Sequence, residues 1–315
     1  MAKSKFIFTT DLHGSETCWR KFLNTAKIHD LDALVMSGDM TGKIMIPIVK
    51  RADGKWNATL LDTPYVLEDK DLPEFEKKCR MICYLPYRTT SAEVSKITES
   101  EKYREDLFEE LEKQIVSYWL TIIPEKVPKK CKVIISPGND DKLGIDEVIK
   151  KCPHVIFGEE EVIALDSEHE VACCGWSNPT PFDSPRECSE EELEQRLEKT
   201  IAKLKNVATS IFCFHVPPYD SGIDEAPMLD STLKPIVVGG SPQMGPAGSK
   251  AVRKMIEKYQ PMLGLHGHIH ESKGKYKIGR TECLNPGSEY SEGIFKGFLV
   301  EVEGDKITKL QRVEG

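Results

Sequence analysis

The sequence predicts an α/β fold. Short apolar runs that indicate buried strands alternate with segments of helical periodicity along most of the 315 residues. Several of these runs are followed immediately by a turn that contains Gly or Pro together with Asp, Asn or His. Ligands of open α/β sheets bind at the carboxyl ends of the strands. The pattern therefore predicts functional side chains that gather at one edge of a sheet layer.

The N-terminal part predicts two strands around one helix. Residues 5–8 and 33–36 are apolar runs of strand length. Between them, residues 16–26 place Trp19 and Phe22 on one helical stripe, as expected for a helix that covers a sheet.

Residues from about 43 to 90 interrupt this alternation. A hairpin with its turn at 52–54 and a short helix over 74–84 are expected within them, and a long charged helix follows at about 91–123. No Pro-, Gly- or Ser-rich linker isolates this part of the chain. We therefore interpret residues 1–315 as a single domain with an insertion at about 43–90. Because the insertion leaves the end of the second strand, we expect it to shape access to the candidate site.

The rest of the chain is rich in predicted strands. Three runs at 154–157, 162–165 and 171–174 leave no room for helices between them, which predicts an antiparallel meander. A capping box at 189–192 begins a helix that extends to about residue 205. The other expected elements are strands at 132–135, 211–214 and 262–265, a helix at 249–259, and a hairpin of 297–302 with 306–313.

The composition supports a folded chain and limits its partners. Apolar residues make up 39% and charged residues 30%, so a sizeable core is available. The 43 basic and 51 acidic side chains give a net charge of −8. This balance argues against binding to long nucleic acids or to an anionic membrane surface, since both require an excess of Lys and Arg.

The cysteines and the N-terminus favour a cytoplasmic location. No apolar run approaches the roughly 18 residues that span a bilayer, and no cleavage site follows the short apolar run before Asp11. The 10 cysteines form no CxxC pair. We therefore expect reduced, mostly buried thiols in place of a disulfide framework or a cysteine-based zinc site.

Seven side chains at the predicted strand ends are suited to bind metal. They are Asp11, His13, Asp39, Asn139, His215, His268 and His270. These N and O ligands suit Mn, Fe, Ni, Zn or Co better than an all-oxygen Mg or Ca site. Seven ligands are too many for one ion, but they suit two divalent ions that share a carboxylate. Such a pair stabilises the attacking and leaving oxygens of an in-line displacement, and its positive charge would attract an anionic substrate.

Each of these residues also has an ordinary structural explanation. An isolated Asp in a turn is usually a cap, and a His in an apolar run can be a satisfied core residue. The ordered set favours ligands over these explanations. We expect His266 to support the ligands or the fold, and His29, His154 and His169 to be structural or surface residues. The Glu runs at 159–161 and 190–192 are expected to be solvated.

Five ordered blocks resemble the signature of the calcineurin-like metallophosphoesterases. The blocks are Asp11-Leu12-His13, Gly38-Asp39, Gly138-Asn139, His215 and Gly267-His268-Ile269-His270. Residues 285–288 also resemble the sequence that follows the last block in many members. The resemblance, which covers Asp11 to about Ser288, implies a four-layer αββα sandwich. In that fold two mixed sheets pack face to face with helices outside.

The resemblance also implies roles for the seven residues. One ion would be held by Asp11, His13, Asp39 and His270. The other would be held by Asp39, Asn139, His215 and His268, with Asp39 as the bridge. A bridging water, whose pKa both ions lower, would be the nucleophile. The implied function is a binuclear metal-dependent phosphoester hydrolase, a phosphodiesterase or phosphatase, for which we favour manganese.

The chain departs from the family pattern beside the candidate ligands. Many members have His after Gly-Asn and Asp three residues after the bridging Asp, where this chain has Asp140 and Gly42. Lys43 stands where Arg is common. The catalytic candidates are therefore Asn139 and Asp140. Asp140 can protonate a leaving group only if its surroundings raise its pKa. Otherwise solvent does so, which favours good leaving groups and phosphodiesters over monoesters.

Other functions stay open at this point. The missing His–Asp pair allows a catalytically weak binding scaffold, similar to a retromer subunit with related blocks, although the complete ligand set counts against it. A nuclease fits the acidic composition poorly. We expect a small phosphoester as the partner and no membrane, with the oligomeric state undetermined. The loop 239–249 either faces the substrate or is a surface loop in which Ser249 caps a helix, and no role is assigned to 178–182.

Overall fold

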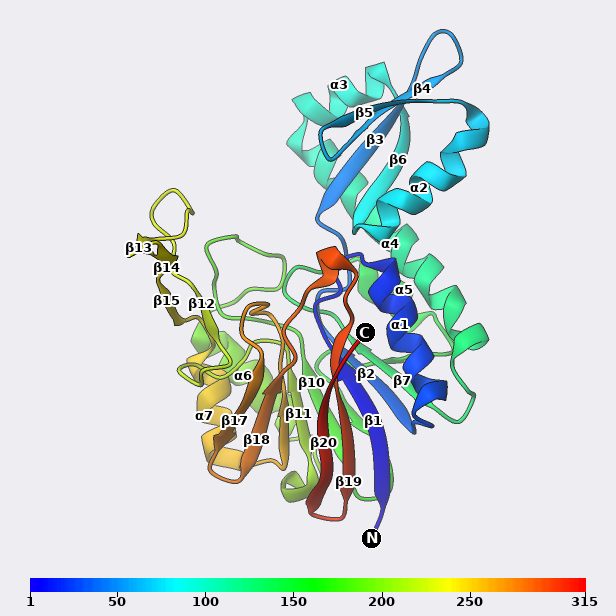
Figure 1. Cartoon of the computed structure of the whole chain (residues 1–315). Coiled ribbons are helices and arrows are strands. Elements are labelled where there is room, and N and C mark those ends of the chain that lie inside the picture. The colour runs from blue at the N-terminus through cyan, green and yellow to red at the C-terminus, as the bar shows by residue number, and fades with distance from the viewer.

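Two six-stranded sheets form the centre of the computed structural model, which describes residues 1–315 (Figure 1). The first sheet contains β1, β2 and β7 as parallel neighbours, with antiparallel strands on one side. Its order is β20 (Lys306–Glu314), β19 (Lys296–Glu303), β1 (Lys3–Thr9), β2 (Ala33–Ser37), β7 (Lys132–Ser136) and β8 (Ile156–Phe157).

The second sheet is also mixed. Its four central strands are parallel and an antiparallel strand lies at each edge. Its order is β17 (Gly274–Ile278), β18 (Thr281–Asn285), β16 (Leu263–Leu265), β11 (Ile211–Phe214), β10 (Glu170–Cys174) and β9 (Val162–Ala164). The chain is thus a mixed α/β protein, as the sequence predicts.

Strand periodicity explains how the first sheet is covered on both faces. Successive side chains of a strand point to opposite faces. In β1, Phe6 and Phe8 join a core cluster with Val171, Ile211 and other residues of the second sheet. Ile7, between them, belongs to a different cluster that contains helix residues. The apolar faces of the two sheets therefore meet, and the remaining faces are available to helices.

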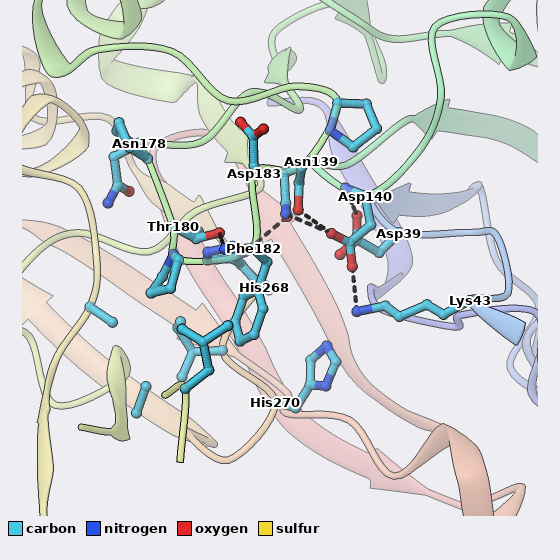
Figure 2. Close-up of a pocket in the computed structure, with 18 of the residues that line it drawn as sticks. Asp39, Lys43, Asn139, Asp140, Asn178, Thr180, Phe182, Asp183, His268 and His270 are labelled. Carbon is cyan, nitrogen blue, oxygen red and sulfur yellow. Dashed lines mark hydrogen bonds and ion pairs between the residues drawn. The ribbon is translucent and has the colours of Figure 1, made fainter. Parts of the chain in front are cut away.

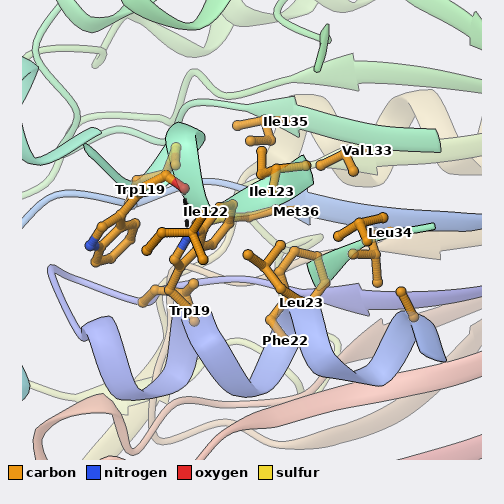
Figure 3. Packing of buried hydrophobic residues seen from close by; sticks show 14 of the residues in the cluster. Trp19, Phe22, Leu23, Leu34, Met36, Trp119, Ile122, Ile123, Val133 and Ile135 are labelled. Atoms are coloured by element: carbon orange, nitrogen blue, oxygen red, sulfur yellow. Dashed lines mark hydrogen bonds between the residues drawn. The ribbon is translucent and has the colours of Figure 1, made fainter. Parts of the chain in front are cut away.

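Helices α1 (Glu16–Ile28), α4 (Glu101–Lys126) and α5 (Ile145–Lys150) contribute to the cluster on the outer face of the first sheet (Figure 3). There Trp19 and Trp119 stack with their ring centroids 5.3 Å apart, and the Trp19 indole donates a hydrogen bond to the Trp119 carbonyl. Helices α6 (Glu190–Ile201) and α7 (Lys250–Tyr259) pack on the second sheet.

Residues 44–90 form a separate four-stranded sheet beyond the first one (Figure 1). Its order is β5 (Thr63–Leu67), β4 (Trp56–Leu60), β3 (Ile44–Lys50) and β6 (Tyr84–Thr90), and α2 (Leu72–Met81) packs on it. The expected hairpin is present as β3 and β4. The predicted long helix is divided into α3 (Ser91–Glu99) and α4, because the Ser100 side chain caps the start of α4.

Three expectations about the second half need correction. The meander is wrong, since β8 pairs with β7 in the first sheet and only β9 and β10 form an antiparallel pair. The helix predicted to reach residue 205 ends at Ile201. Glu159 is buried and not solvated, because it accepts hydrogen bonds from the Ser136 hydroxyl and the Gly175 amide.

A projecting arm completes the fold. It runs from residue 225 to 246 and contains β12 (Glu225–Pro227), β13 (Val237–Val238), β14 (Ser241–Pro242) and β15 (Met244–Pro246) (Figure 1). All ten cysteines are free, and eight of them are buried. None of the helices combines the length and apolar character that a bilayer crossing needs.

Candidate metal centre

The seven candidate ligands lie together where strands of the two sheets end. Asp11 and His13 follow β1, Asp39 follows β2, and Asn139 follows β7, all in the first sheet. The second sheet contributes the remaining three: His215 after β11, and His268 and His270 after β16. Parallel strands place these turns at one edge, so residues more than 250 positions apart in the sequence become neighbours.

The Asp and His residues form two groups that could each hold a metal ion. In each group one ligand atom per residue lies within 4.8 Å of every other, and Asp39 belongs to both groups. The groups are Asp11, His13, Asp39 and His270, and Asp39, His215 and His268. The amide oxygen of Asn139 is 3.0 Å from His215 Nε2 and 2.7 Å from His268 Nδ1. Asn139 therefore extends the second group.

Four of these residues have a left-handed backbone, which is rare outside glycine. The φ angles are 53° at Asp11, 40° at His13, 49° at Asp39 and 66° at His268. Such conformations cost about 1–3 kcal/mol each and persist where the surrounding structure enforces them. Their concentration at one edge indicates that the turns are shaped to aim these side chains inward.

Two motif glycines allow the close approach of the turns. A Cβ at Gly38 would lie 2.0 Å from the His215 ring, and one at Gly138 would lie 2.2 Å from an Asp39 carboxylate oxygen. Gly38 also has a φ of 90°. The sequence blocks Gly-Asp and Gly-Asn thus have a steric reason, since a side chain at either glycine would separate candidate ligands.

Asp141, which the sequence analysis does not single out, fastens two of the turns together. Its carboxylate accepts hydrogen bonds from the amides of Met40, Thr41 and Gly138 at 3.1, 3.0 and 2.9 Å. Asp11 is held by the His268 amide at 3.0 Å. No spacing rule marks Asp141, because its role depends on turns that are about one hundred residues apart.

Burial and charge fit the cluster to cations. Burial lowers the pKa of His268 to about 3, which keeps this imidazole in the neutral, metal-binding form. Burial, followed by repulsion from Asp140, raises the pKa of Asp39 to about 6. Burial would lower the pKa of His215, but Asp39 and then Asp11 outweigh it and raise the pKa to about 10. The buried carboxylates thus require positive charge, and the donor set of imidazoles, carboxylates and one amide suits divalent transition metals.

Asp140 lies beside the cluster but does not have the environment of a general acid. It forms an ion pair with Lys43 (Figure 2). It also accepts a hydrogen bond of 2.6 Å from the Ser184 hydroxyl. Burial would raise the pKa of Asp140, but Lys43 and then His13 outweigh it and lower the pKa to about 2. The acid role considered from the sequence requires a raised pKa, so these surroundings argue against it.

A cavity of about 1470 Å³ opens beside the cluster. Residues 178–185 line it, although the sequence analysis assigns 178–182 no role. The high proportion of Pro in this loop is the sequence feature that could have indicated its place in the cavity wall. From loop 239–249, Pro246, Ala247 and Gly248 line the cavity, while Ser249 caps α7. The insertion and the helix after it contribute Ile44, Met45, Arg104, Phe108 and Glu112.

The relatives found by sequence comparison match only part of this chain. No family model matches it. Uncharacterized protein MJ1162 of Methanocaldococcus jannaschii is 33% identical over 164 residues, which are 51% of this chain and 62% of that protein. Probable inactive purple acid phosphatase 24 of Arabidopsis thaliana is 30% identical over 59 residues, which are 19% of this chain and 10% of that protein. The chain thus matches less than two thirds of the length of either relative.

Solved structures resemble the chain over its whole length. TT1561 of Thermus thermophilus has a TM-score of 0.53 and 15% identity, covering 99% of both chains. Another crystal structure has a TM-score of 0.57 and 18% identity, also covering 99% of both chains. At these identities the likeness concerns the fold alone. Independently of these comparisons, the Asp/His groups of the structure could hold a metal ion.

Proposed function

We propose that the protein is a binuclear metal-dependent phosphoester hydrolase with a calcineurin-like αββα sandwich. The observation that carries the proposal is the pair of buried Asp/His groups that share Asp39. Two cations with a shared carboxylate are a recurrent arrangement in enzymes that displace a group at phosphorus. The partial similarity to a probable inactive purple acid phosphatase supports the same fold, but not by itself turnover.

The residues would divide between two ions as the family resemblance implies. Asp11, His13, Asp39 and His270 would hold one ion, and Asp39 with His215, His268 and Asn139 would hold the other. We favour manganese, with Fe, Ni, Zn or Co as alternatives. When bound, such ions supply a water that is activated near neutral pH and neutralise charge on the phosphoryl oxygens.

Lys43 and Asp140 prepare the cavity side of the centre for an anionic ester. The Lys43 ammonium is held by Asp140 and lines the cavity, where it attracts a phosphoryl group. Asp140 stays ionised, and it also accepts a hydrogen bond of 3.0 Å from the Asn139 amide, which orients the Asn139 oxygen towards His215 and His268. Since Asp140 does not donate a proton, the leaving group takes one from solvent. Phosphodiesters with good leaving groups are therefore the proposed substrates.

One observation favours a second candidate, a metal-binding scaffold with weak catalysis. The position beside Asn139 holds a carboxylate that stays ionised, so the chain lacks a proton donor there. A scaffold would retain the metal cluster without efficient turnover. The two functions differ in what they predict for hydrolysis by a metal-loaded protein.

The test combines metal content with turnover. We expect protein dialysed against Mn²⁺ to contain two equivalents by plasma mass spectrometry and to hydrolyse bis-p-nitrophenyl phosphate. Asp39→Asn should bind less metal. Its turnover should fall by more than about 10- to 100-fold, which is the decrease typical of removing a residue that only supports a ligand. Asp305→Asn, in the exposed turn between β19 and β20 and outside both the cluster and the cavity, is the matched control. Two bound ions with no hydrolysis of any diester would favour the scaffold, and absence of metal would refute both.

A further inference from the structure

We propose that the substrate carries a bulky apolar organic group esterified to the phosphorus, and that Phe182 and Leu233 bind this group in the cavity beside the metal centre. The inference rests on the proposed hydrolase function and names its substrate class. It follows from the size of the cavity, the chemistry of its walls, and the way in which the wall is attached to the candidate metal centre.

The cavity is larger than a small phosphate ester needs. Its volume is about 1470 Å³. Pockets for small molecules typically measure about 300–1000 Å³ and bury most of the ligand surface. A phosphoryl group with a methyl substituent would contact only the end formed by His268, His270 and Asp39. The remaining space is available to a large group on the ester.

Prolines make much of the wall apolar and rigid. Six of them line the cavity: Pro179, Pro181, Pro185, Pro227, Pro235 and Pro246. Proline has no amide hydrogen to donate, and its ring fixes φ. A proline wall therefore provides apolar contact with little loss of conformational entropy, but it offers few hydrogen bonds to a polar ligand.

Phe182 is an unpartnered aromatic ring inside this cavity. It is 67% exposed although it is a large apolar residue, and it lines the same cavity as His268 (Figure 2). An apolar ligand group that covers the ring removes this surface from water, which stabilises the complex. The exposed ring would therefore stabilise a complex in which an apolar ligand group lies against it.

The loop that carries Phe182 is fixed to the candidate metal centre. Ser184, two residues along, donates its hydroxyl hydrogen to Asp140 at 2.6 Å. Arg186 is buried, its amide donates to the Asn139 carbonyl at 3.0 Å, and its side chain donates to the Asp141 carbonyl at 2.9 Å. These contacts fix the loop that carries the ring relative to the candidate metal centre, as a binding wall requires.

The projecting arm also contributes apolar side chains to the cavity. Leu233 is 50% exposed, and it lines the cavity together with Leu229 and Pro235. Several charged side chains of the lining already have partners in the protein. Lys142 pairs with Glu105 at 2.5 Å, and Lys43 pairs with Asp140. The exposed apolar side chains of the lining, Phe182 and Leu233, are the part of the wall available to an apolar ligand group.

The first experiment varies the retained group while the leaving group stays constant. The probes are p-nitrophenyl methyl, p-nitrophenyl hexyl and p-nitrophenyl phenyl phosphate. In each, water forms a bond to phosphorus and p-nitrophenolate leaves. Full burial of one methylene is worth about fourfold, so with partial burial we expect kcat/KM to rise at least about tenfold from the methyl to the hexyl or phenyl ester. A larger rise for hexyl indicates an aliphatic group, and a larger rise for phenyl indicates an aromatic one.

Variants connect this preference to the wall. Phe182→Ala and Leu233→Ser should each lower the hexyl-to-methyl or phenyl-to-methyl ratio of kcat/KM by about fivefold, from the loss of apolar contact. The matched control is Val66→Ser, an exposed apolar position on β5 outside the cavity, which should leave the ratio unchanged. A ratio near one in the wild-type protein, or a ratio that neither variant changes, would overturn the inference.

A binding measurement separates this inference from the proposed hydrolase function. Phenylphosphonate, hexylphosphonate and methylphosphonate are titrated calorimetrically into Mn²⁺-loaded protein. We expect phenyl- or hexylphosphonate to bind about tenfold more tightly than methylphosphonate, and Phe182→Ala to reduce that difference. If none of the esters is hydrolysed but this preference holds, the hydrolase proposal fails and the apolar site stands. Equal affinity, or no binding, refutes the apolar site even when the methyl ester is hydrolysed.

Discussion

Glu112 on α4 provides a sharp test of the electrostatics in this structure. Its side chain is buried, one of its carboxylate oxygens has no hydrogen-bond partner, and it lies at the cavity wall near Thr41. Burial raises the pKa of Glu112 from 4.5 to about 9; Thr41 acts in the lowering direction and repulsion from Asp141 in the raising one. Lys142 and Glu109, which act in opposite directions, are the other charged neighbours.

The raised pKa means that Glu112 lowers stability at neutral pH. Between pH 4.5 and about 9 the unfolded chain is ionised at this residue while the folded chain keeps the proton. Stability is therefore lost as pH rises through this window. Each pH unit above 4.5 costs about 1.36 kcal/mol, so the cost is below about 1 kcal/mol at pH 5 and about 3 kcal/mol at pH 7. Gln has the same shape and cannot ionise, so Glu112→Gln should remove this cost.

Urea denaturation of metal-free protein, followed by circular dichroism at pH 5 and pH 7, measures the difference. Glu112→Gln should be about 3 kcal/mol more stable than the wild type at pH 7 and nearly equal to it at pH 5. Glu110→Gln, on the same helix but 60% exposed, is the control and should show no such pH dependence. A gain of the same size at both pH values, or a loss at pH 7, would show that Glu112 is ionised in the folded protein.

Three further predictions address the turns, the cavity and the core. Gly38→Ala should cost about 2–4 kcal/mol in a thermal melt, because its Cβ would lie 2.0 Å from the His215 ring; a melting temperature equal to the wild type would contradict that geometry. Asp140→Asn should slow esters of p-nitrophenol and of simple alcohols by similar factors, since Asp140 is already ionised; steady-state kinetics showing selective slowing of the alkyl esters would restore an acid role. Trp119→Ala should lower stability by about 3–5 kcal/mol in urea, because Trp119 is fully buried against Trp19, and a cost below about 1 kcal/mol would mean that this helix is not packed as described.

Local patterns predicted the parts of this fold that local physics controls. Strands with strict apolar runs, such as β1 and β2, and the polar turns after them could be identified because burial and turn chemistry act over a few residues. The sheet to which β8 belongs could not, since its two residues pair with the preceding strand β7 across helix α5, while the next strand, β9, joins the other sheet. The break at Ser100 was missed because helical periodicity continues on both sides of it.

The candidate site, too, could be predicted only in part from local patterns. The seven candidate ligands were chosen from the polar turns after the strand-like runs and from the family resemblance, and the structure brings them together. Asp141 and the loop with Phe182 were not found, because their importance depends on contacts between turns from different strands. The environment of Asp140 also required the structure, since the contacts from Lys43 and Ser184 that keep it ionised cross between separate loops.

The division of candidate ligands between the two sheets has a mechanical consequence. Each proposed ion takes ligands from both sheets, so a bound cation would act as a cross-link between the two halves of the sandwich. Any sliding of one sheet over the other would change several metal–ligand distances at once. Substitutions at Phe8 or Leu265, which pack between the sheets, should therefore alter cation affinity. Chelation should in turn increase hydrogen exchange along the inner strands.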